Sequence, residues 1–177
     1  MKPILLFLCI FSICIHCSCS SQSKTSSRNE KKIFRLGIIT LKQKGISDSE
    51  ASSLSYRLQT VIGEIIKSKK YQNSGKDSYI LVDRSKLDEL LKQYDIENPA
   101  SLSDSLATEV GTIYPVDRVV LGNIYLLKKT YYISARIVDV ESGLIINNIH
   151  HEHKGSFESL QSRGIKDITE KLLYGKK

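Results

Sequence analysis

The chain has no tryptophan, one methionine and three prolines, and all four of its cysteines lie within the first 19 residues. Any folded region after residue 19 therefore lacks cysteine, which excludes a disulfide scaffold and a catalytic thiol there. Histidine is equally scarce: apart from His16, all of it lies between residues 150 and 153, so a Ser–His–Asp triad has little to draw on. The phosphate-binding loop and the G-x-S-x-G and H-E-x-x-H motifs are also absent. These absences predict a protein that is not an enzyme, needs no cofactor and takes no small-molecule substrate.

The longest apolar run lies at the start of the chain. Residues 4–15 follow Met1-Lys2-Pro3 and are almost continuously apolar. About 12 residues are too few to cross a bilayer core of roughly 30 Å as a helix, and such a run is typical of a secretory signal peptide. Cysteines crowd its end, as in a bacterial lipoprotein signal, where one cysteine becomes the lipidated first residue. We predict a signal peptide over 1–18 and lipidation of Cys19, with Cys17 as the runner-up; an ordinary signal peptide with incidental cysteines is the other interpretation.

A polar stretch separates the signal from the rest. Residues 19–32 are rich in serine and lysine without apolar periodicity, which predicts a lipidated N-terminus followed by a disordered linker. Ser20, not an acidic residue, follows Cys19; by resemblance to enteric lipoprotein sorting, this favours the outer membrane, with the domain on its periplasmic face. Removing 1–18 takes away Lys2 and no acid, so the net charge of +7 becomes about +6. That charge is scattered, and an exported protein has no nucleic-acid partner; a solvated surface and attraction to anionic lipid or cell-wall polymer both fit it.

Residues 33–177 are enough for one domain. We predict the α/β (α+β) class: a mixed β-sheet with a C-terminal antiparallel three-strand meander, packed by about four helices in the order β-α-β-α-α-β-β-β-α. The meander occupies 117–151, and we expect its outer strands, around 119–127 and 144–149, to be well covered. Alternation is clearest in the middle strand, where one face carries Tyr131, Ile133, Ala135 and Ile137 and the other Tyr132, Ser134 and Arg136.

The remaining elements are predicted from caps and periodicity. A strand covers 33–41, a helix begins at a capping box of Ser47 and Glu50, and a short strand covers 79–83. Ser85 is expected to cap the next helix. A short helix is expected over 102–110, and an amphipathic helix over 157–173 closes the domain.

Three sequence segments, in this order, carry a family resemblance: Leu81-Val82-Asp83-Arg84-Ser85, Val110-Gly111 with VDRVVLG at 116–122, and ARIVDVESG at 135–143. Over 33–174 the domain resembles the CsgG family (curli production assembly/transport component), with the related LpoB-type activators of penicillin-binding proteins and the TolB N-terminal domain. The resemblance implies a helix-covered mixed sheet, a periplasmic location at the outer membrane, and function through protein contacts.

This chain departs from both branches of the family it resembles. Curli-type channels build a pore from added β-hairpins whose strands need about 9–11 residues each to cross the bilayer, and no such insertion is found here. Activators of the LpoB type use a long tether, and residues 20–32 are too short for one. We therefore expect a protein without its own pore that binds periplasmic envelope proteins or itself. A ring-forming accessory subunit of a curli-type outer-membrane secretion channel is the alternative.

Two groups of side chains are candidate sites. Tyr132, Ser134 and Arg136 combine an aromatic, a hydroxyl and an arginine on one strand face, a composition enriched at interfaces. They form a candidate interface unless the 157–173 helix covers them. His151 and His153 share a strand face as two imidazole ligands would, but no third ligand is identifiable. We therefore expect no metal, and interpret HHEH as an exposed, polar end of a fraying strand.

Overall fold

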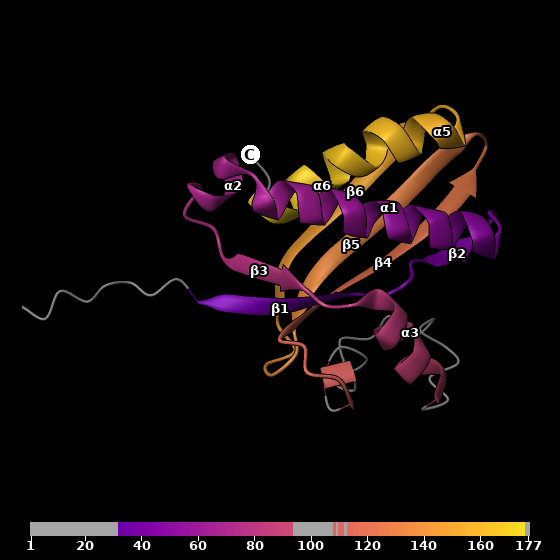
Figure 1. The fold of residues 1–177 in the computed structure, drawn as a ribbon. Helices are drawn as coiled ribbons and strands as arrows, with labels where there is room; N and C mark the ends of the chain where they lie inside the picture. The colour runs from indigo at the N-terminus through magenta and orange to yellow at the C-terminus, as the bar shows by residue number, and fades with distance from the viewer. Residues whose placement is uncertain (1–31, 94–107, 109, 112, 176–177) are drawn as a thin grey trace, which may run out of the picture. The chain divides into compact units, whose positions relative to one another are not determined.

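The computed structural model describes residues 32–93, 108, 110–111 and 113–175 (Figure 1). The described residues form one compact unit. Its strands are β1 (Ile33–Ile38), β2 (Lys42–Lys44), β3 (Ser78–Leu81), β4 (Arg118–Leu127), β5 (Thr130–Asp139) and β6 (Ile145–Lys154). The helices described over their full length are α1 (Asp48–Lys67), α2 (Lys69–Gln72), α3 (Arg84–Gln93) and a C-terminal helix made of α5 (Phe157–Ser159), a π-helical turn η1 (Leu160–Gly164) and α6 (Ile165–Tyr174).

The six strands form one mixed sheet in the order β3-β1-β4-β5-β6. The strand β1 runs parallel to both β3 and β4, while β4, β5 and β6 are successively antiparallel. The short β2 pairs in parallel with the second half of β4, beyond the point where β1 leaves it. The sheet thus begins as a parallel unit in the N-terminal half and ends as the predicted meander.

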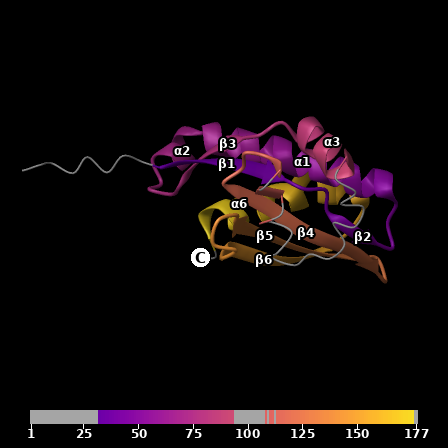
Figure 2. The same cartoon turned by 90° about the horizontal axis from the view of Figure 1, so that it is seen from below.

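Helices cover the two sheet faces unequally. On one face, α1 and α6 lie side by side across the meander, and their apolar stripes pack on the alternating residues of β5 (Figure 1). This core includes Leu54, Leu58, Ile133, Ile137 and Ile168, each at most 3% exposed. On the other face, α3 packs against one end only, where Leu87 meets Val119, Leu121 and Val138. Among the described residues, the far end of that face carries no helix, as the view in Figure 2 shows.

The class, the single mixed-sheet domain and the meander are as predicted. Tyr131, Ile133, Ala135 and Ile137 are buried, and their alternate neighbours are half-buried. The capping box also forms: the Glu50 amide donates to the Ser47 hydroxyl, and the Ser47 amide donates to the Glu50 carboxylate at 2.8 Å.

Three predictions about individual elements are wrong. The strand predicted over 33–41 ends at Ile38. A second strand that was not predicted follows at Lys42–Lys44, a segment with no apolar residue. The helix α3 is capped by Asp83, whose Oδ1 accepts from the Ser85 amide at 2.8 Å, and not by Ser85. The strand over 144–149 is not well covered, since β6 is the edge of the sheet.

The side chains at the start of β6 are largely exposed to solvent: Leu144 is 65%, Ile145 45% and Ile146 43% exposed. The predicted helix over 102–110 lies almost entirely outside the described residues.

Candidate protein-interaction face

The uncovered end of the sheet brings together side chains from β4, β5 and β6. The antiparallel register pairs Asn123 with Ser134 and Tyr125 with Tyr132, and β6 adds His150 and Glu152 opposite them. Paired residues in a sheet point to the same side, so these six side chains form one continuous surface. We call Asn123, Tyr125, Tyr132, Ser134, His150 and Glu152 the open face. A shallow hollow of about 510 Å³ is lined by these six residues with Ile133 and His151.

Two tyrosines form the centre of the open face. The rings of Tyr125 and Tyr132 stack with their centroids 5.0 Å apart and their planes 10° from parallel. Tyr125 is 42% exposed, and Tyr132 is half-buried. Aromatic pairs of this kind are rigid and present a large apolar area with a polar hydroxyl at the edge, which suits them to recognition.

The turn that joins β4 to β5 places the tyrosine pair. Lys128 and Lys129 have φ angles of 47° and 65°, as a two-residue hairpin turn with a right-handed strand twist requires. A two-residue turn fixes the register of the whole hairpin, so Tyr125 and Tyr132, three residues from the turn on either side, must face each other. Next to them, the Ser134 hydroxyl donates to Asn123 Oδ1 at 2.7 Å.

The predicted interface row is only partly on this surface. Tyr132 and Ser134 belong to the open face. Arg136 is half-buried at its border, opposite the buried Leu121 and the exposed Asn148. The 157–173 helix does not cover the row, because its residues Leu160, Ile168 and Leu172 belong to the core on the other side of the sheet. Tyr125 and Asn123 were missed, although the symmetry of the hairpin about Lys128-Lys129 was sufficient to find them.

The histidines divide between the two faces of β6. His150 lies on the open face, whereas His151 and His153 point toward the C-terminal helix. His151 Nδ1 is 3.3 Å from the Asp167 carboxylate, and its side chain is only 13% exposed. Burial lowers the pKa of His151, against the opposing effect of Asp167. His153 Nε2 is 2.6 Å from the Ser159 hydroxyl.

The interpretation of HHEH as an exposed, fraying strand end is therefore wrong for His151 and His153. The strand β6 continues to Lys154, and these two rings contact Asp167 and Ser159 of the C-terminal helix. In the described residues, no group of three or more His, Cys, Asp or Glu side chains is placed to hold a metal ion.

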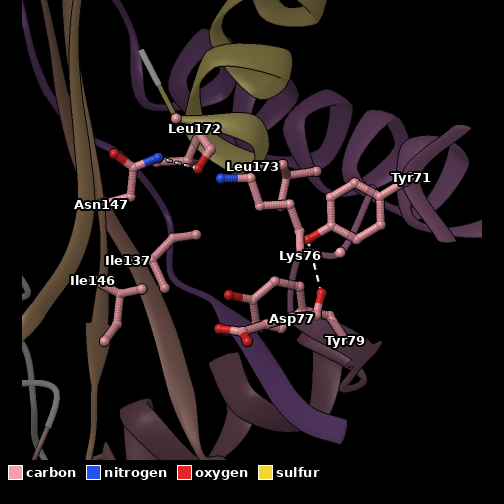
Figure 3. A pocket seen from close by; sticks show the side chains of 11 residues that line it. Tyr71, Lys76, Asp77, Tyr79, Ile137, Ile146, Asn147, Leu172 and Leu173 are labelled. Carbon is pink, nitrogen blue, oxygen red and sulfur yellow. Dashed lines mark hydrogen bonds between the residues drawn. The ribbon is translucent and has the colours of Figure 1, made fainter. Parts of the chain in front are cut away.

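A second hollow, of about 290 Å³, lies where α6 ends beside β3 and β6 (Figure 3). Several of its polar groups are engaged within the domain: the Tyr71 hydroxyl donates to the Asp77 carbonyl at 2.9 Å, and Asn147 Nδ2 donates to the Leu172 carbonyl at 2.6 Å. The Asp77 carboxylate accepts from the Arg118 guanidinium at 2.6 Å, and so does the Tyr79 hydroxyl. We therefore assign this hollow a structural role.

Arg118 explains why so many polar groups converge there. Its side chain is 8% exposed, and its guanidinium lies 3.6 Å over the centroid of the Phe34 ring. Asp77 and Asp139 supply the opposing charge. A buried cation needs such partners, and here they join β4 to β1, β3 and β5.

Among the described helices, none combines the length and the apolar composition needed to cross a membrane.

The fold of this domain is similar to that of a bacterial lipoprotein of known structure. The lipoprotein GNA1162 from Neisseria meningitidis matches with a TM-score of 0.54 at 14% sequence identity, over 70% of this chain and 81% of that one. The LpoB C-terminal domain from Salmonella enterica gives a TM-score of 0.48 at 14% identity, over 69% and 83% of the two chains. The same domain from Escherichia coli gives 0.46 at 15% identity, over 69% and 83%.

No family model and no curated protein matches the chain. At these identities, the likeness to the Neisseria lipoprotein shows the fold alone. Membership of the CsgG family stays a prediction from the sequence.

Proposed function

We propose that this protein is a lipid-anchored component of a bacterial envelope that acts by binding another protein through the open face. The anchor is a lipidated Cys19, or Cys17, after the apolar run at the start of the chain. The location is the periplasmic side of the outer membrane. The protein works without a pore of its own and without catalysis. The fold that it shares with a bacterial lipoprotein is consistent with this function.

The observation that carries the proposal is the stacked tyrosine pair on a sheet face that no described helix covers. On the other side of the same sheet, α1 and α6 form the larger core, so the fold does not require a helix over the open face. Rigid aromatic side chains surrounded by amide, hydroxyl and charged groups are the composition that dominates binding energy at protein interfaces.

A photo-crosslinking amino acid in place of Tyr132 tests this proposal in the intact envelope. We expect a covalent adduct with a second protein. The matched control places the same amino acid at Tyr56, a 69% exposed tyrosine on α1 that lies away from the open face. Adducts at both positions or at neither would contradict the proposal.

The oligomeric state gives a second measurement. Sedimentation of the detergent-extracted chain is expected to show a monomer or dimer. A high-order ring would overturn the docking proposal in favour of a ring-forming accessory subunit of a secretion channel.

A further inference from the structure

Lysines border the open face on two sides, along β2 and at the end of the sheet that carries the β4–β5 turn. Lys42 and Lys44 of β2 pair in register with Asn123 and Tyr125 of β4, which places their side chains on the same side of the sheet. Lys128 and Lys129 form the turn beyond the tyrosine pair, and Lys154 lies opposite Thr130 at the end of β6. All five are exposed. We call Lys42, Lys44, Lys128, Lys129 and Lys154 the lysine rim.

The charge of this surface is one-sided. Glu152 is the only carboxylate among the residues that define the open face and the lysine rim, which leaves a net charge of +4 with histidine neutral. A basic rim around an apolar centre raises the local concentration of acidic partners and accelerates their binding.

Among the residues that the structure describes, a second copy of the same domain offers no matching acidic surface at the other end of the sheet. There, Asp77 and Asp139 lie beside Arg118. Asp117 forms a two-point contact with Arg35, at 2.8 Å and 3.1 Å. These carboxylates are already neutralised within the domain.

From this charge pattern we propose that the open face binds an acidic segment of a different envelope protein. An apolar side chain of that segment packs on Tyr125 and Tyr132, and its carboxylates pair with the lysine rim. This inference rests on the proposed function and specifies the chemistry of the partner.

Binding of a defined peptide tests the inference on the full chain in a neutral detergent. The probe is a short fluorescent peptide rich in glutamate with a central pair of leucines; its counterpart has glutamine in place of every glutamate. We expect the glutamate peptide to bind about tenfold more tightly at low salt, and this difference to shrink as salt screens the lysines.

Two double variants locate the effect. Lys44→Glu with Lys129→Glu should remove the preference for the glutamate peptide. Lys67→Glu with Lys166→Glu, which reverses two exposed lysines on α1 and α6, should leave it intact. Equal binding of both peptides, or equal effects of both double variants, would overturn the inference.

The crosslinker at Tyr132 separates this failure from failure of the proposed function. A foreign-protein adduct whose yield falls with the rim variant and not with the control supports both proposals. A foreign-protein adduct insensitive to the rim variant keeps the proposed function and overturns the acidic partner. An adduct with lipid, or with a second copy of the chain, overturns the inference.

Discussion

At the scale of single residues, position along β6 decides what each histidine does. Successive side chains of a strand point to opposite sides, so His150 and Glu152 face outward while His151 and His153 face the C-terminal helix. A Cβ at Gly164 would come 3.2 Å from His153 Nδ1 and 2.6 Å from Leu160 Cδ1. The glycine therefore lets the π-helical turn approach the strand, and the two inward histidines serve packing.

His151 makes stability depend on pH. Burial lowers the pKa of its imidazole below the ordinary 6.5, in spite of Asp167, with Lys171 and His153 lowering it further. Its Nε2 is buried without a hydrogen-bond partner, so a proton there would have no acceptor. The unfolded chain then binds a proton more readily than the folded chain, and the free energy of unfolding must fall as pH drops below about 6.5.

We expect the midpoint of thermal unfolding to drop between about pH 7.5 and about pH 5.5, and His151→Asn to reduce that drop. His150→Asn is the control, because His150 is exposed on the open face and should leave the pH dependence unchanged. A drop of the same size in the parent protein, His151→Asn and His150→Asn would show that His151 is not the source of the pH dependence.

At the scale of elements, the sequence predicted the features that depend on neighbouring residues, such as the start of a helix and the buried side of a strand. The alternation in β5 identified its buried side, and Ser47 with Glu50 marked the start of α1. The strand β2 was missed because Lys42-Gln43-Lys44 has no apolar residue, and only its pairing with β4 makes it a strand. Leu144 and Ile145 are exposed because β6 is the edge strand of the sheet. The order of strands depends on the whole chain, so the sequence of this segment alone could not predict that exposure.

The N-cap of α3 shows the same limit and can be tested. Both Asp83 and Ser85 are good capping residues. The helix begins at Arg84, so Asp83 is the residue that caps it. Asp83→Ala should lower the free energy of unfolding by about 1 kcal/mol, measured by urea denaturation. Ser85→Ala should be nearly neutral. The reverse order of effects would restore the prediction made from sequence.

The two sides of β5 give a sharper contrast. Ile133 is 3% exposed beneath α1 and α6, so Ile133→Asp buries an unpaired carboxylate and should unfold the domain, at a cost of several kcal/mol. Ser134→Asp places the same group on the open face and should be much milder. Circular dichroism melts would compare them, and equal damage would mean that the open face is covered in solution.

At the scale of the whole molecule, the proposed function combines two parts that the chain supplies separately. The start of the chain carries the predicted anchor signal, and the compact unit carries a basic, aromatic surface that no described helix covers. The proposed anchor would hold the domain at the membrane surface and raise its local concentration there, so modest affinity would be enough to bind a partner in the same membrane.

The anchor is therefore the feature on which the proposed function most depends. Each buried CH₂ of an acyl chain contributes about 0.8 kcal/mol to membrane binding, so a cysteine carrying several chains would be held firmly. Cys19→Ala should abolish labelling by a fatty-acid analogue and move the protein from the membrane fraction to the soluble fraction. Cys17→Ala is the matched variant and should leave both readouts unchanged. Loss of labelling with Cys17→Ala alone would shift the site by two residues. Labelling of neither the parent chain nor any variant would remove the lipid anchor from the proposed function.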